Sequence, residues 1–198
     1  SSKETHDAII IGGGASGMAT ARRLIELGQE PLIIEKQEFL GGAGIHAGRF
    51  FAVETAWQDQ QGIEDNVATA MGEWTERTKC SPHPALEDFL SQSSNILRWI
   101  GAEYFDKVQY TPDSGWRIHP INDDAGVPPL RVWAEDLTDN SILNTSVTKL
   151  IIENNVAVGV EVADGRRFYS SRIVVATGGF GRNLDYVQSV YPEFSSTN

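Results

Sequence analysis

The sequence predicts an α/β fold with a central parallel sheet, to which a three-stranded antiparallel β-meander is added. Three observations lead to this fold class: a short apolar run that ends in a glycine-rich turn, an amphipathic segment after it, and a second apolar run that ends in an acid. Strand, turn, helix and strand fill about thirty residues, the size of one βαβ unit. Strands of a buried parallel sheet are typically continuous apolar runs of this kind.

The βαβ unit is predicted at the start of the chain. Residues 7–11, Asp-Ala-Ile-Ile-Ile, form the first strand. Residues 15–27 carry apolar side chains at helical spacing, and Gly28 follows as a stop signal for the helix. Residues 31–35, Pro-Leu-Ile-Ile-Glu, form the second strand. Strand order within the rest of the sheet is not predicted from this unit alone.

The remaining elements follow in order along the chain. We expect helices over 63–79 and 84–100, a long loop with short strands over 106–129, one or two helical turns over 132–139, meander strands over 147–153, 156–162 and 167–169, and a last buried strand over 173–176. Asn154-Asn155 and Asp164-Gly165 are good hairpin turns because these residue types tolerate positive φ. We expect one domain over 1–198, divided into a tail (1–6), the βαβ unit with a glycine loop (7–60), a helical insertion (61–140) and the meander with the closing strand (141–198).

Composition and charge limit the partners. The formal net charge is −11, and an acidic chain repels nucleic acid and anionic membrane surfaces, so neither is expected as a partner. The single cysteine, Cys80, excludes an intrachain disulfide, and together with His83 it is too little for a metal site, so no metal is assigned. No apolar run approaches 18 residues, which predicts no membrane span. A cytoplasmic location is expected, with export after removal of a signal also open.

The first glycine motif is G-x-G-x-x-G over Gly12, Gly14 and Gly17. Gly12 allows the tight turn out of the strand, Gly14 lets a pyrophosphate approach the backbone, and Gly17 lets the helix pack close to the strand. Ala15 and Ser16 belong to the helix start, whose free N–H groups attract phosphate. In this context the motif predicts a Rossmann-like dinucleotide site.

Glu35 ends the second predicted strand, 18 residues after Gly17. A carboxylate at this tip accepts hydrogen bonds from both hydroxyls of an adenosine ribose and repels a 2′-phosphate, which argues against NADP. The motif and Glu35 alone leave both FAD and NAD open.

Three separate segments resemble the fumarate reductase/succinate dehydrogenase flavoprotein family. They are residues 7–17, then Glu35-Lys36 with Gly41, Gly42, Ala43 and Gly44, and then residues 173–183, which read Ile-Val-Val-Ala-Thr-Gly-Gly-Phe-Gly-Arg-Asn. The resemblance implies that FAD is the cofactor. It also implies that Gly41–Gly44 lie along the pyrophosphate and ribityl chain, that Val147 contacts the adenine through its backbone, and that Ala176, Thr177 and Gly178 close on the cofactor.

The resemblance further implies an FAD-dependent oxidoreductase that transfers hydride between flavin N5 and an activated carbon–carbon bond, with a small unsaturated acid or ketone as substrate. Members of the family are longer, and their capping domain, which carries the catalytic arginine, has no counterpart here. Arg182 belongs to the strand-end motif, so no catalytic residue is assigned. A fragment of a longer protein, a completing C-terminal chain or homo-oligomer, or a reduced flavoprotein would each account for this difference.

Alternative interpretations of two histidines and of the function stay open. His46 lies in the second glycine loop, where a noncovalent or loop role is favoured over a covalent bond to FAD. His119, in Trp116-Arg117-Ile118-His119-Pro120, favours a structural cluster over an anion site. Two other functions remain as alternatives: a noncatalytic FAD-binding module and an NAD-binding dehydrogenase.

Overall fold

The computed structural model describes residues 4–46, 48–101, 109–111, 115–120, 128–181 and 183–192. The chain divides into two compact units, which we describe separately: unit 1 comprises Ser1–Ile45 with Trp133–Asn198, and unit 2 comprises His46–Val132. The organisation as one domain stays a prediction. Among the described residues, every helix is too short or too polar to cross a membrane.

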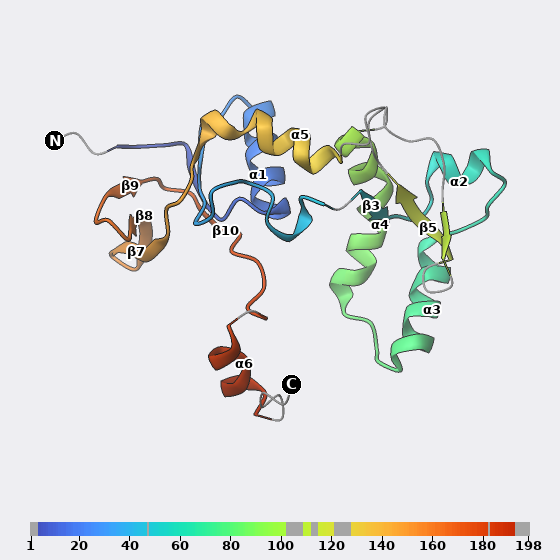
Figure 1. Ribbon diagram of the computed structural model, residues 1–198. Coiled ribbons are helices and arrows are strands. Elements are labelled where there is room, and N and C mark those ends of the chain that lie inside the picture. The colour runs from blue at the N-terminus through green and yellow to red at the C-terminus, as the bar shows by residue number, and fades with distance from the viewer. Residues whose placement is uncertain are drawn as a thin grey trace. The chain divides into compact units, whose positions relative to one another are not determined.

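Unit 1 is built on a parallel sheet, as predicted (Figure 1). Its strands, in the order in which they lie side by side, are β10 (Ile173–Val175), β1 (Ala8–Ile11), β2 (Pro31–Ile34) and β6 (Ser141–Ile142). All neighbouring pairs are parallel. Helix α1 (Ala15–Glu26) connects β1 to β2, and Gly28 after it has φ +75°. The predicted α/β fold with a βαβ unit is therefore confirmed.

Each face of this sheet is covered by a different element. Ile9, on one face, packs in a core cluster with Val160 and Phe168 of the meander. Because side chains alternate along a strand, Ile10 points to the opposite face. A Cβ on Gly17 of α1 would lie 3.4 Å from Ile10, so α1 covers that face. Both isoleucines are fully buried.

The meander has the bounds that the sequence predicts: β7 (Val147–Glu153), β8 (Val156–Val162) and β9 (Arg167–Tyr169), all antiparallel. Asn154 and Asn155 have φ 50° and 63°, as a tight hairpin turn requires. The segment before β1 pairs with Tyr169 of β9. Tyr169 N–H donates to Glu4 O at 2.9 Å, and His6 N–H donates to Tyr169 O at 3.0 Å.

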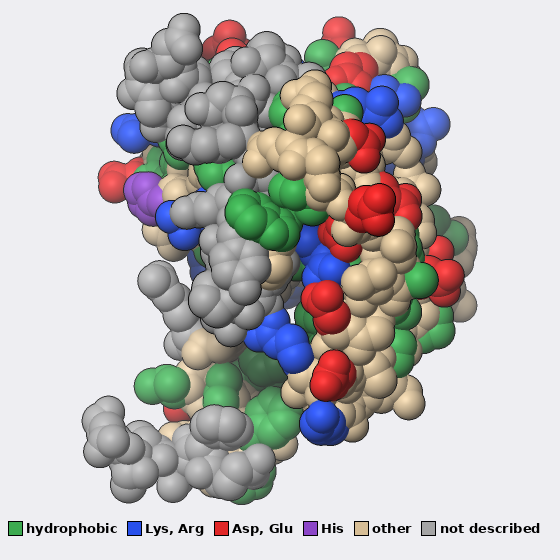
Figure 2. Space-filling view, turned by 90° about the vertical axis from the view of Figure 1, so that its right-hand side faces the viewer, with side chains coloured by type: hydrophobic (Ala, Val, Ile, Leu, Met, Phe, Trp, Pro, Cys, Tyr) green, Lys and Arg blue, Asp and Glu red, His purple; other side chains and the backbone are tan. Residues whose placement is uncertain are grey.

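Unit 2 combines three helices with a small antiparallel sheet. Its elements are β3 (Arg49–Phe51), α2 (Ala56–Gln60), α3 (Val67–Thr78), α4 (Pro84–Gly101), β4 (Gln109–Thr111) and β5 (Gly115–Pro120), with sheet order β3-β5-β4. Ala52 packs with Leu97 of α4, and Val53 packs with Ala70 and Leu90. Figure 2 shows acidic side chains spread over the face that it views, in keeping with the net charge of −11.

Several short elements differ from the prediction. The helix expected from residue 63 begins at Val67, because the Asn66 side chain accepts a hydrogen bond from Thr69 N–H and caps the helix there. The helical turns expected over 132–139 are α5 (Pro129–Asp136) and a 3₁₀ turn, η3 (Thr138–Asn140). Among the described residues, the elements that the sequence did not predict include β3, α2, β6 and α6 (Leu184–Val190).

Candidate functional site

The first glycine turn joins β1 to α1 in unit 1, where neighbouring backbone closes around it. Gly12 has φ +101°, in the region that favours glycine. A Cβ on Gly12 would lie 2.5 Å from Ala176 O, and one on Gly17 would lie 2.0 Å from Gly12 O. The fold itself therefore requires glycine at both positions.

Gly14 has a different environment. No heavy atom from elsewhere in the described residues lies within 4 Å of a Cβ placed on it, and its φ of −74° suits any residue. Gly14 is also the N-cap of α1, and among described residues no side chain caps this helix. The amides at Ala15 and Ser16 are thus at a helix end that suits an anion, beside free space that a ligand close to the backbone would use.

Glu35 lies directly after β2 and is 8% exposed. Its Oε2 accepts a hydrogen bond from Gly13 N–H at 2.7 Å, and its Oε1 accepts one from Gln37 N–H at 2.8 Å. These bonds fix the carboxylate beside the glycine turn and leave each oxygen a further lone pair. The arrangement suits a ribose diol and disfavours a 2′-phosphate.

The second glycine loop packs directly on the first. It comprises Gly41 and the 3₁₀ turn η1 (Gly42–Gly44), which includes Ala43. Gly41 N–H donates to Gly13 O at 2.7 Å, and a Cβ on Gly42 would lie 3.3 Å from Gly14 Cα. Gly41 and Gly42 have φ +123° and +52°. The two loops together form one surface, which we call the glycine cradle (Gly12–Gly17 with Gly41–Gly44).

Sequence reasoning missed one contact inside the cradle. Leu40 is 3% exposed, and a Cβ on Gly13 would lie 2.3 Å from Leu40 Cδ2. A side chain at Gly13, the residue that the G-x-G-x-x-G pattern leaves free, would therefore displace the buried Leu40 side chain. The one signal for this contact was an apolar residue directly before the Gly41-Gly42 pair.

The predicted closing turn follows β10. Ala176 N–H donates to Ile11 O at 2.9 Å, which extends the pairing with β1 up to Gly12. Thr177 and Gly178 follow and are exposed, and Gly178 has φ +74°. The structure therefore places Ala176 at the edge of the cradle, and its contact with a cofactor stays a prediction.

The chain that leads toward Val147 pairs with the backbone of Glu35, and the contact of Val147 with an adenine stays a prediction. Thr145 N–H donates to Glu35 O at 2.9 Å, and Glu35 N–H donates to Ile142 O at 2.9 Å. The segment that leads into β7 thus lies along Glu35. Val147 itself is partly buried and packs against the central sheet, so its side chain serves the core.

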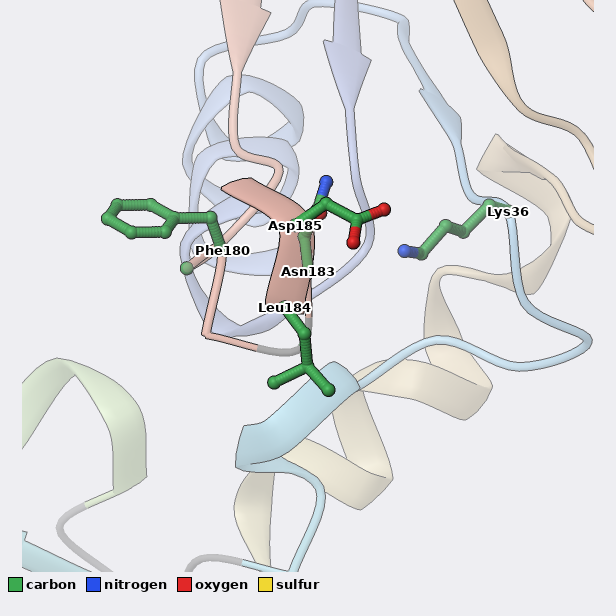
Figure 3. Close-up of a pocket in the computed structure, with 6 residues that line it drawn as sticks. Lys36, Phe180, Asn183, Leu184 and Asp185 are labelled. Carbon is green, nitrogen blue, oxygen red and sulfur yellow. The ribbon is translucent and has the colours of Figure 1, made fainter. Parts of the chain in front are cut away.

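A cavity of about 520 Å³ lies beside Lys36, the residue that follows Glu35 in the sequence (Figure 3). Six residues line it: Lys36, Gly179, Phe180, Asn183, Leu184 and Asp185. Of these, the sequence assigned only Lys36 to the site. The others were missed because α6 was not predicted, although Asn183 is a good N-cap residue: its Oδ1 accepts a hydrogen bond from Tyr186 N–H at 3.0 Å.

His119 is fully buried in unit 2 and lies in a polar network. Its Nε2 is 2.8 Å from Thr55 Oγ1, and its Nδ1 is 3.1 Å from Arg117 O. Burial lowers the pKa of His119, and hydrogen bonds to the Arg117 and Phe50 backbone and the charge of Asp65 offset only part of this effect. The structural interpretation of His119 is favoured over an anion site.

Arg117 is fully paired in the same network. Its Nε and Nη2 donate to Asp65 Oδ2 and Oδ1, both at 2.8 Å, and its Nη1 donates to Glu73 Oε2 at 2.5 Å. Burial alone would lower the pKa of Arg117, but the hydrogen bonds and charges of Asp65 and Glu73 outweigh it and raise the pKa. A guanidinium engaged in this way holds elements of unit 2 together.

The other candidate residues have simple environments. His46 is exposed, and its noncovalent role stays a prediction. Cys80 is exposed, and His83 Nδ1 accepts a hydrogen bond from Ala85 N–H at 3.1 Å. The described residues contain no group of three or more His, Cys, Asp or Glu side chains that could hold a metal ion. Arg182 lies outside the described residues.

Comparison with known proteins gives one family. Residues 7–198 match the family described as "FAD binding domain". The chain is 26% identical to the NADH:fumarate oxidoreductase of Klebsiella pneumoniae (strain 342) and 28% identical to the fumarate reductase (cytochrome) of Shewanella frigidimarina, in each case over 98% of this chain. A flavocytochrome c3 fumarate reductase in its open conformation superposes with a TM-score of 0.82, at 20% identity, over 98% of this chain.

This chain is much shorter than these proteins. It spans 23% of the Klebsiella protein, 37% of the Shewanella protein and 37% of the superposed chain. The structural likeness, at 20% identity, supports the fold, with its parallel sheet and added meander.

Proposed function

Because this chain belongs to the FAD binding domain family of fumarate reductase-like flavoproteins, we propose that it holds FAD on the glycine cradle as the flavin-binding part of an oxidoreductase. The observation that carries the proposal is the free space at Gly14, where a glycine is present without any requirement from the described fold. A pyrophosphate that lies against the backbone at Gly14 would leave no room for a side chain there, and this accounts for the glycine.

Each neighbouring residue then has a distinct part in binding. The uncapped start of α1 at Ala15 and Ser16 binds the phosphates. Glu35 accepts the ribose hydroxyls with the lone pairs that its backbone hydrogen bonds leave free. Gly41–Gly44 extend the cradle along the cofactor, and the Ala176–Gly178 turn borders it from β10.

The reaction proposed is a reduction or oxidation of an activated carbon–carbon bond. When bound, FAD supplies hydride transfer at its flavin N5, and the protein supplies binding and orientation. The substrate proposed is a small unsaturated acid or ketone, in line with the reductases of fumarate among the relatives. We assign no catalytic residue, and the proposed activity belongs to the whole protein, completed by a further segment, a partner chain or a second copy.

Reconstitution with FAD tests the binding proposal. The purified chain should take up FAD, visible in its absorption spectrum and identified by mass spectrometry after release. Gly14→Val should lower FAD affinity at least about tenfold while the fold persists, because a side chain there meets the ligand and not the protein. A chain that takes up no FAD would overturn the proposal.

Two other glycines serve as matched controls. Gly72 lies in the interior of α3 with open space around it, so Gly72→Ala should fold and bind FAD as the original chain does. Gly17→Ala should unfold the chain more easily, because its Cβ would lie 2.0 Å from Gly12 O. If circular dichroism shows that Gly14→Val loses folded structure, the space at Gly14 is needed for packing of the protein and not for a ligand.

A second candidate is a noncatalytic FAD-binding module. It rests on the glycine cradle alone, since no catalytic residue is assigned in the described part of the chain. It predicts bound FAD without turnover of fumarate or related enoates by the isolated chain when a reduced dye is the electron donor. Measured turnover would reject this candidate and support the enzyme.

A further inference from the structure

Leu40 anchors the second glycine loop in the interior of unit 1. Residues 36–39 before it are exposed, and so are Gly42 and Ala43 after it, whereas Leu40 is 3% exposed. A buried apolar side chain between exposed neighbours holds a loop in place, because moving the loop would return apolar surface to water. The position of Gly42–Gly44 therefore depends on where the Leu40 side chain lies.

The Leu40 side chain occupies the space that Gly13 leaves open. Gly13 is buried, and a Cβ there would lie 2.3 Å from Leu40 Cδ2, closer than two carbon atoms can approach. The backbone of Gly13 is engaged as well. Its N–H donates to Glu35 Oε2 at 2.7 Å, and its oxygen accepts a hydrogen bond from Gly41 N–H at 2.7 Å. Gly13 thus contacts the Glu35 carboxylate, the second loop and the Leu40 side chain.

We propose that Leu40 is a positioning residue for FAD, acting through Gly13 and the second glycine loop. With the Leu40 side chain against Gly13, Gly41 pairs with the first loop and Gly42 lies against Gly14. A cofactor that lies along both loops needs them in this register, because groups that are already in place bind without the cost of being ordered. This inference rests on the proposed function, since it assumes that FAD binds at the cradle.

Substitutions of Leu40 test the inference. Leu40→Ala removes the part of the side chain that contacts Gly13 and should lower FAD affinity about tenfold, measured by fluorescence titration of the apoprotein. Leu40→Met keeps an apolar side chain of similar volume and should retain most of the affinity.

Leu32→Ala is the matched control. Leu32 is also buried, but it packs with Val160 and Phe168 in the core between the central sheet and the meander. Leu32→Ala should therefore lower the free energy of unfolding, as Leu40→Ala does, and leave FAD affinity unchanged. Urea unfolding and the titration measure these two effects separately.

A pair of substitutions at the contact itself gives a result that general damage to the fold cannot produce. Gly13→Ala alone displaces the Leu40 side chain and should lower FAD affinity. In the Leu40→Ala background the same methyl group enters the space that Cδ2 has left, so there Gly13→Ala should raise FAD affinity. The φ of Gly13 lies outside the left-handed region, so its backbone permits alanine.

The outcomes distinguish this inference from the proposed function. Circular dichroism first establishes that each variant is folded, and if Leu40→Ala is not, Leu40→Val, which lacks the δ carbons, replaces it in both comparisons. If Leu40→Ala and Leu32→Ala bind FAD equally well, or if Gly13→Ala lowers affinity equally in both backgrounds, the role of Leu40 is overturned and the FAD site stands. If the original chain binds no FAD, the proposed function itself is overturned.

Discussion

Burial lowers the pKa of His119 in the folded chain below its ordinary value of 6.5. In the unfolded chain the imidazole is in water and gains its proton near that ordinary value. As the pH falls below 6.5, the unfolded state therefore binds more protons at this residue than the folded state does. The free energy of unfolding that is present at neutral pH decreases as a result. We predict a loss of at most about 1.4 kcal/mol per pH unit in the free energy of unfolding from this residue.

Urea unfolding between pH 7.5 and 5.5 measures this contribution. His119→Gln should be less stable at neutral pH, because it disturbs the contact with Thr55, yet it should lose less stability on acidification than the original chain. Parallel pH profiles for the two proteins would contradict the prediction. His83→Gln is the matched control, since that imidazole is in an exposed turn.

Single residues also show what a sequence pattern can and cannot indicate. The glycines at 12, 14 and 17 were predicted together, but packing requires only Gly12 and Gly17, whereas a Cβ on Gly14 would meet no described atom within 4 Å. Glu35 was predicted as a ribose ligand, and its hydrogen bond to Gly13 N–H was not. A motif specifies residue types, whereas bonds between its own residues depend on side-chain directions that spacing does not specify.

At the scale of elements, two side chains cap the start of α3: Glu54 Oε1 accepts a hydrogen bond from Val67 N–H at 3.1 Å, and Asn66 caps a further amide. Asn66 Oδ1 accepts a hydrogen bond from Thr69 N–H at 2.8 Å. Asn66→Ala removes this acceptor, and we predict a loss of about 1 kcal/mol in the free energy of unfolding, measured by urea denaturation. Asn66→Asp keeps an acceptor and should retain most of the stability. An alanine variant as stable as the original chain would show that the cap is unimportant.

The bounds of an element were predicted accurately where the residues that determine them lie within the element or in the adjoining turn. The bounds of β7, β8 and β9 were predicted correctly because Asn154-Asn155 and Asp164-Gly165 encode the turns between them. Strand β6 has two residues and exists because Ile33 and Ile34 of β2 pair with it. No pattern within such a short segment distinguishes it from a loop, and the same holds for β3 and α6.

On the scale of the whole chain, bound cofactor should appear as added stability. A ligand at 100 times its dissociation constant that binds only the folded state adds about 2.7 kcal/mol. We predict that FAD raises the midpoint of thermal unfolding by several degrees, roughly 2–4 °C per kcal/mol at this size. NAD shares the adenosine and pyrophosphate but has no flavin, so it should raise the midpoint less. A larger shift with NAD would favour a nicotinamide-dependent dehydrogenase instead.

For the whole molecule, the fold class and the family were predictable because three separated segments agree in order along the chain. The residues assigned to the cofactor site all lie in unit 1, although the whole of unit 2, His46–Val132, lies between Gly44 and Val147 in the sequence. The parallel sheet explains this convergence, because the carboxyl ends of its strands meet at one edge. The network of Arg117 with Asp65 was not predictable, since its partners are far apart in sequence.

The two backbone hydrogen bonds of Glu35 have a consequence for engineering cofactor preference. Exchanging an acid at this strand end for a basic residue is an obvious route toward phosphorylated nucleotides. In this chain the same exchange would also release Gly13 and Gln37 from the carboxylate. A redesign would have to supply a replacement acceptor for the Gly13 amide before the new preference could be expressed, so the specificity of this site cannot be edited one residue at a time.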